Sequence, residues 1–84
     1  MKVYDLRKIV SANVKYYRYL IGYTQEQLAE KCDLSPRYVS DIENSRGNIS
    51  LNTIENIAKY LKVEPYLLLK KQQHQHLQKR VNMK

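Results

Sequence analysis

The sequence predicts an all-α fold, a compact domain of five helices that includes a helix-turn-helix. The first observation behind this prediction is that a polar side chain suited to cap a helix precedes an apolar pattern of helical spacing at Thr24, Ser35 and Ser50. The second is the short interval between the first two of these caps, which leaves room for about two turns of helix and a tight bend. Two short helices joined in this way form a helix-turn-helix.

The composition is that of one small domain followed by a polar tail. We expect residues 1–69 to form the domain, while residues 70–84, rich in Gln and Lys, form a frayed or disordered basic tail. No apolar stretch approaches the roughly 18 residues of a membrane span, and a single cysteine agrees with a reducing cytoplasm. We therefore expect a cytoplasmic protein in which Cys32 is a small core residue, with a redox switch as the alternative.

The first predicted helix spans about residues 4–21. Apolar side chains recur there at spacings of three and four residues, which indicates an amphipathic helix. These side chains are Leu6, Val10, Val14, Tyr17 and Ile21. Gly22 is suited to end the helix because glycine tolerates the left-handed conformation of a helix C-terminus. The polar face is basic, and we interpret most of its charges as solvated. They belong to Arg7, Lys8, Lys15 and Arg18.

Two capped helices follow in residues 24–46. Thr24 and Gln27 have the spacing of a capping box, so the first of these helices should begin at Gln25. Ser35 is suited to cap the second, with Pro36 preset at its first position. From this periodicity alone, a purely structural helical hairpin is as good an interpretation as a DNA-reading one.

A loop and two further helices complete the predicted domain. Gly47 can supply a positive φ angle in the loop at residues 45–48. Ser50 then caps a helix over residues 51–61. A weaker pattern that starts at Pro65 predicts a short last helix to about Leu69.

Three motifs make the chain similar to a known family. They are T-Q-x-x-L-A at residues 24–29, S-x-x-Y-V-S-x-I-E at residues 35–43 and S-L-x-T-I-x-x-I-A-x-x-L at residues 50–61. From about residue 10 to residue 69, the chain resembles the helix-turn-helix domain of the phage-repressor (Cro/cI, or Xre) transcription regulators. Residues 35–48 are most similar to the controller proteins of restriction-modification systems.

The resemblance implies a lambda-repressor-like fold and a DNA-binding transcription regulator, either a repressor or an autoregulatory controller. Such a protein binds a palindromic operator in double-stranded DNA as a homodimer, with the recognition helix, here about residues 36–44, in the major groove. The resemblance also implies a structural ion pair between Arg18 and Glu43 that holds this helix. Asp33 occupies a turn position where the family often has Gly, but Asp tolerates the left-handed conformation, so we expect the turn to form.

We expect two classes of DNA contact, to base edges and to phosphates. Arg37 is the foremost candidate for base reading because a guanidinium can bond O6 and N7 of one guanine, and the alternative interpretation is a solvated surface charge. The side chains presented to the groove are Ser35, Pro36, Arg37, Tyr38, Ser40 and Asp41, of which Pro36, Arg37, Tyr38 and Asp41 are expected to read bases. Phosphate contacts are expected from Thr24, Gln25, Ser40, Arg46 and Asn48.

The distribution of charge limits how the chain can hold DNA. The net charge is +7, but the tail holds five basic and no acidic residues, so residues 1–69 carry a net charge of only +2. Within them, residues 24–46 carry a net charge of −2. The basic residues of the tail are Lys70, Lys71, Lys79, Arg80 and Lys84. Phosphate affinity must therefore come from a few placed donors and helix N-termini, with the tail as a further source.

A homodimer is expected because one reading helix covers too few base pairs to be selective. The exposed apolar side chains proposed for its interface lie on the last two helices. They are Leu51, Tyr60, Tyr66, Leu67 and Leu69.

Two rival functions remain at this point. One is an antitoxin-type protein that binds DNA and also a partner protein. The other is nonspecific binding of nucleic acid or an anionic membrane by the tail. An enzyme is not expected, because the sequence has no Gly-rich phosphate loop, no paired carboxylates and no Cys/His or Ser/His arrangement, and no cofactor is implied. His74 and His76 lack further ligands at metal-binding spacing, so no metal site is expected.

Overall fold

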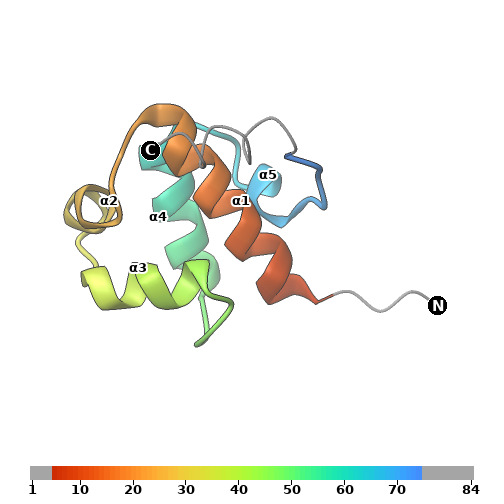
Figure 1. The fold of residues 1–84 in the computed structure, drawn as a ribbon, viewed down its shortest axis with the longest axis horizontal. Coiled ribbons are helices and arrows are strands. Elements are labelled where there is room, and N and C mark those ends of the chain that lie inside the picture. The colour runs from red at the N-terminus through yellow and green to blue at the C-terminus, as the bar shows by residue number, and fades with distance from the viewer. Residues whose placement is uncertain (1–4, 75–84) are drawn as a thin grey trace.

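The computed structural model describes residues 5–74, and this part of the chain is folded into five helices without a β-strand. The helices are α1 (Leu6–Ile21), α2 (Gln25–Cys32), α3 (Pro36–Glu43), α4 (Leu51–Leu61) and α5 (Tyr66–Leu69). The predicted all-α, five-helix architecture with a helix-turn-helix is confirmed. In Figure 1, α1 and α4 run through the middle of the domain, α2 and α3 lie on one side of them, and α5 lies beside α1.

The helix starts follow the caps expected from the sequence, with one correction. The side chains of Thr24, Ser35 and Ser50 each accept a hydrogen bond from a backbone N–H in the first turn of the helix that follows. The first helix was expected from about residue 4, but it begins at Leu6. Asp5, in extended conformation, is its N-cap and accepts from the N–H of Lys8 at 3.3 Å.

Three helices end in a residue of left-handed conformation. Gly22 ends α1 with φ of 88°, as predicted, and Asp33 ends α2 with φ of 57°, so the turn forms without a glycine. Lys62 ends α4 with φ of 63°. No local pattern predicted this conformation for a lysine, whose side chain has no means of stabilising it as Asp or Asn does.

The core lies where α1, α2, α3 and α4 meet, and α5 closes it. Its buried apolar side chains are Val10, Val14, Leu28, Ala29, Cys32, Val39, Ile42, Ile54, Ile57, Ala58, Leu61 and Leu68. Cys32 is 2% exposed, and burial raises the pKa of its thiol, which fits the expected core role. Asn56 of α4 donates to the carbonyl oxygen of Cys32 at 2.8 Å and so satisfies the end of α2.

A buried amide holds α5 against α1. Asn13 is 1% exposed, and its Nδ2 donates to the carbonyl oxygens of Leu68 at 2.9 Å and Lys70 at 2.8 Å. The chain then continues along α1 to His74, whose ring stacks on Tyr16 at 3.8 Å between centroids. The expected boundary lay at residue 69, and the chain stays packed on the domain for five residues beyond it. Residues 75–84, with His76 and the basic side chains of Lys79, Arg80 and Lys84, lie outside the described residues.

Within residues 5–74, no helix has the length and apolar character needed to cross a membrane.

Candidate nucleic-acid interface

A buried ion pair fixes α3 to α1. The guanidinium of Arg18 donates through Nε to Oε2 of Glu43 at 2.6 Å and through Nη2 to Oε1 at 2.8 Å. The two side chains are only 7% and 1% exposed. This is the pair that the family resemblance implied. Because Glu43 is the last residue of α3, the ion pair sets how this helix is held on the domain.

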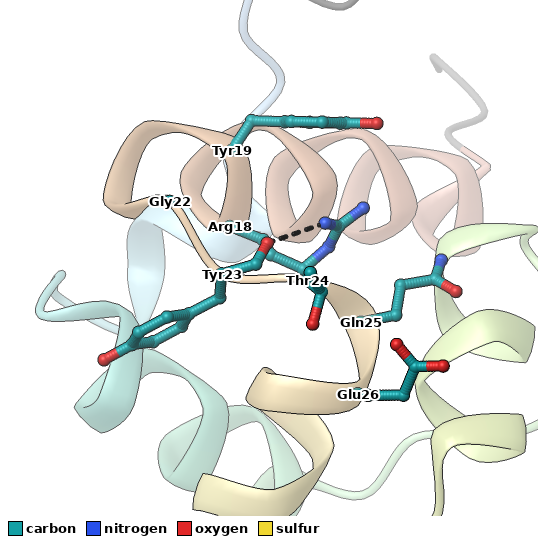
Figure 2. Close-up of a pocket in the computed structure, with 7 residues that line it drawn as sticks. All are labelled: Arg18, Tyr19, Gly22, Tyr23, Thr24, Gln25 and Glu26. Atoms are coloured by element: carbon teal, nitrogen blue, oxygen red, sulfur yellow. Dashed lines mark hydrogen bonds between the residues drawn. The ribbon is translucent and has the colours of Figure 1, made fainter. Parts of the chain in front are cut away.

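Further contacts surround the guanidinium. Burial by itself lowers the pKa of Arg18, but hydrogen bonds to Glu43 and the charge of Glu43 leave that pKa raised above its ordinary value. Arg18 also donates through Nη1 to the carbonyl oxygen of Tyr23 at 2.9 Å, and its guanidinium lies 4.6 Å from the ring centroid of Tyr19. Figure 2 shows this guanidinium extending from α1 toward the start of α2, beside a shallow hollow of about 370 Å³. Arg18 therefore remains charged and is held on several sides.

Gln25 belongs to the same network. Its Nε2 donates to Oε1 of Glu43 at 2.9 Å, which ties the first residue of α2 to the last residue of α3. Thr24 accepts from the N–H of Gln27 at 3.0 Å, and the side chain of Gln27 accepts from the N–H of Thr24 at 2.8 Å, which completes the predicted capping box. A phosphate at this helix start would meet exposed Thr24 and a Gln25 side chain already oriented by Glu43.

The outward face of α3 presents a strongly exposed guanidinium. The side chain of Arg37 is 89% exposed, and its Nε lies 3.8 Å from Oδ2 of Asp41, one turn along the helix. Asp41 also lies 3.5 Å from Nε of Arg46, measured to Oδ1. One carboxylate therefore faces two guanidinium groups. Exposed pairs at such distances contribute only about 0–1 kcal/mol, so both cations can exchange this partner for DNA at little cost.

The loop after α3 is held from two sides by contacts to Asn48. Tyr38 of α3 donates its hydroxyl proton to the carbonyl oxygen of Asn48 at 2.8 Å, and Arg7 of α1 donates through Nη2 to Oδ1 of Asn48 at 2.7 Å. The sequence did not predict either contact. A phosphate bond donated by the Tyr38 hydroxyl would require the bond to Asn48 to break, which leaves the ring as the part of this side chain available to DNA.

The two serines of α3 support its backbone. Ser35 is exposed, and its hydroxyl accepts from the N–H of Tyr38 at 3.0 Å as the N-cap. Ser40 is half-buried, and its carbonyl oxygen accepts from Nδ2 of Asn44 at 2.8 Å. The Asn44 amide is thus bonded back onto the last turn of α3.

The structure gathers the expected DNA-contacting residues on α3, on the start of α2 and in the loop after α3. The exposed members of this set are Thr24, Ser35, Pro36, Arg37, Arg46 and Asn48. Half-buried are Gln25, Tyr38, Ser40 and Asp41. In Figure 1, α3 lies along one edge of the domain with this loop at its C-terminal end. Sequence reasoning missed Arg7, because its partner Asn48 is 41 residues away in the chain.

The residues expected at a dimer interface differ in exposure. Leu51 is 74% exposed and Tyr66 is 61% exposed. Tyr60, Leu67 and Leu69 are half-buried, and Tyr60 and Leu69 pack against the core. Leu51 and Tyr66 are therefore the two side chains of this set with most apolar surface left to cover.

Between residues 5 and 74, no cluster of three or more His, Cys, Asp or Glu side chains is arranged to hold a metal ion.

A comparison with protein families identifies this arrangement. The family model described as helix-turn-helix matches residues 14–68, which include α2, α3 and α4 in full. A hypothetical transcription factor of Neisseria meningitidis is 43% identical over 65 residues, or 77% of this chain and 61% of the relative. The control protein C.BamHI of Bacillus amyloliquefaciens is 52% identical over 46 residues, or 55% of this chain and 57% of the relative. The chain thus matches about three fifths of the length of these two relatives.

Solved structures with the same fold agree with this assignment. The crystal structure of the Neisseria transcription factor superposes with a TM-score of 0.79 at 38% identity, covering 94% of this chain and 83% of the other. The controller protein C.Esp1396I, bound to a 19 base pair DNA duplex, superposes with a TM-score of 0.69 at 36% identity, covering 75% of this chain and 84% of the other.

Proposed function

Because the chain belongs to the helix-turn-helix family of the Xre/Cro type, we propose that it is a sequence-specific DNA-binding transcription regulator. It binds a palindromic operator as a homodimer, with residues 36–44 of each copy in the major groove. The observation that carries this proposal is the exposed Arg37 at the start of α3, on a helix whose other end is fixed by the buried pair of Arg18 and Glu43. A helix held in this way, with an exposed guanidinium whose ion pair to Asp41 is weak, is suited to read a base edge.

Arg37 reads guanine in this proposal. Its guanidinium leaves Asp41 and donates to O6 and N7 of one guanine, a contact that contributes roughly 1–3 kcal/mol of discrimination. Pro36 and the ring of Tyr38 add apolar contacts to neighbouring bases, such as thymine methyl groups. Asp41, released from Arg37, keeps Arg46 as a partner and can accept from the amino group of a cytosine.

Phosphate contacts flank the reading helix. Thr24 and Gln25 meet the backbone at the start of α2, where the helix dipole favours an anion. Ser40, Arg46 and Asn48 meet it along α3 and in the following loop. Residues 24–46 carry a net charge of −2, so these few contacts must be well placed. The similar protein C.Esp1396I, solved bound to a 19 base pair DNA duplex, supports double-stranded DNA as the ligand.

The dimer joins two such units across the operator. Leu51 on α4 and Tyr66 on α5 are the most exposed apolar side chains of these two helices, and the half-buried Tyr60, Leu67 and Leu69 are the further candidates for the interface. Two half-sites are then expected one helical turn apart, about 34–36 Å between centres. The similarity to C.BamHI, a control protein, favours a regulatory role, which we propose to be that of a repressor or an autoregulatory controller.

Selection from random DNA duplexes at near-physiological salt, with sequencing of the retained fraction, tests this function. The expected result is one enriched palindrome with its half-sites one turn apart. Sedimentation of the protein with the selected duplex should give two protein chains per duplex, and a duplex with one half-site destroyed should bind much more weakly. Retention of duplexes without an enriched motif contradicts sequence-specific reading, and a single bound chain on the intact palindrome contradicts the homodimer.

A further inference from the structure

We propose that Arg7 of α1 is a further DNA-contacting residue, which binds a backbone phosphate beside the loop at residues 45–49. This inference rests on the proposed function and adds to it a contact from the first helix, outside the helix-turn-helix. Arg7 is exposed near the start of α1, seven residues before the segment that the family comparison matches.

The position of the Arg7 guanidinium is set by a neutral group. Its Nη2 donates to Oδ1 of Asn48 at 2.7 Å. The carbonyl oxygen of the same Asn48 accepts from the hydroxyl of Tyr38 at 2.8 Å. Arg7 is thereby linked through one loop residue to the reading helix. A guanidinium carries five N–H donors, so the bond to Asn48 leaves others free to point outward.

The charge of Arg7 is not balanced by an ion pair within the described part of the chain. Among residues 5–74, no carboxylate lies within ion-pair distance of its guanidinium, whereas Arg37 and Arg46 both lie near Asp41. At α3 and its loop, the carboxylate of Asp41 is shared by Arg37 and Arg46, and the carboxylate of Glu43 is bound to Arg18, so neither of them pairs with Arg7. An uncompensated cation that is fixed in place favours a polyanionic partner.

Arg7 and Arg46 border the same small hollow, which is also lined by Gly47. Gly47 has φ of +76°, and the position of a Cβ on it is free of neighbours within 4 Å. The loop backbone at this point is thus open to close approach by a ligand. Two arginines that line one hollow with an open backbone segment supply the kind of N–H donors that a DNA phosphate accepts, several at a time.

The test is a salt series on the operator selected with the wild-type protein, comparing wild type with Arg7→Gln, Arg7→Lys and the matched control Lys8→Ala. Lys8 is also exposed and adjacent in sequence, and its substitution removes the same charge. Each phosphate contact contributes about −0.9 to the slope of log affinity against log salt concentration. Two copies of Arg7 per operator therefore predict that Arg7→Gln makes the slope shallower by about 1.8. This change corresponds to a loss of affinity of about 30-fold near 0.15 M salt.

Arg7→Lys should retain most of the wild-type salt slope, because lysine also brings a positive charge to the phosphate. Lys8→Ala should change the salt slope by less than half as much as Arg7→Gln does. The weakening should be equal on specific and random duplexes, since a phosphate contact carries no sequence information. Equal slopes for Arg7→Gln and Lys8→Ala overturn the inference. The inference is also overturned if Arg7→Gln changes the preferred sequence but not the salt slope, because Arg7 would then only support the loop. In both cases the proposed function stands if wild type still selects its palindrome.

Discussion

Loss of Glu43 should destabilise the domain far more than loss of any exposed carboxylate. The change is Glu43→Ala, which leaves the Arg18 guanidinium, 7% exposed, without its counter-ion and leaves the amide of Gln25 without its acceptor. Removing one partner of a buried ion pair costs about 3–5 kcal/mol. A domain of this length is expected to have a free energy of unfolding of roughly 4–12 kcal/mol, so the variant loses a large part of its stability.

Urea denaturation followed by circular dichroism, at one fixed protein concentration, measures this loss. With a slope of about 1.5 kcal/mol per molar urea, a loss of 3 kcal/mol lowers the midpoint by about 2 M. In thermal unfolding, the same loss lowers Tm by at least roughly 12 °C. Glu55→Ala is the matched control, because Glu55 is exposed on α4, and its free energy of unfolding should change by no more than about 0.5 kcal/mol.

A double-mutant cycle then separates the pair from its surroundings. Arg18→Leu with Glu43→Leu removes both charges, so the double variant should be less destabilised than the sum of the two single variants by more than about 1 kcal/mol. The reasoning is refuted if Glu43→Ala unfolds at the same urea concentration as Glu55→Ala, or if the effects of the single variants simply add.

Two other expectations concern stability. Lys62→Gly should raise the free energy of unfolding by up to about 1 kcal/mol, because glycine adopts the left-handed conformation at φ of 63° without strain. Thermal unfolding should show a higher Tm for this variant. An unchanged or lower Tm counts against strain at Lys62. Burial raises the pKa of Cys32, so the folded protein holds the thiol proton to higher pH than the unfolded chain does. The corresponding stability is fully present below the unfolded thiol pKa of about 8.5 and is lost as pH rises through the folded value. Cys32→Ala should flatten the decline of stability over this alkaline range, and an equally steep decline in that variant would show that other groups cause it.

The elements that sequence reasoning placed well are those defined by local chemistry. Thr24, Ser35 and Ser50 each bond a backbone N–H within three residues, so their role is visible in the pattern around them. Gly22 and the apolar spacing of the helices are local in the same sense. Asp5 is also a local cap, and it was missed because the helix was predicted to start at about residue 4, two residues before its observed start at Leu6.

The contacts that sequence reasoning missed join residues far apart in the chain. Asn13 bonds carbonyl oxygens 55 and 57 residues away, and Arg7 bonds an amide 41 residues away. A polar residue in an amphipathic helix gives no local sign of whether it faces solvent or the backbone of a later segment. The pair of Arg18 and Glu43 was anticipated only through the family resemblance, since its 25-residue separation leaves no periodicity to detect.

The exposed candidate residues have roles that the fold alone does not assign. Arg37 is exposed and only weakly paired with Asp41, but the base that it contacts depends on DNA that approaches from solvent. Tyr38 shows the opposite case, because a phosphate bond from its hydroxyl competes with the bond to Asn48 inside the domain.

The measurement that tests the central claim most directly is selection from random duplexes with Arg37→Ala, run beside wild type and a Lys59→Ala control. Lys59 is exposed on α4, so its substitution removes a positive charge from a different helix. The account predicts that Arg37→Ala loses the preference for guanine at one position of each half-site, at a cost of about 1–3 kcal/mol per contact, while Lys59→Ala selects the wild-type motif. An identical motif and affinity for Arg37→Ala and wild type would contradict base reading by Arg37, the central claim.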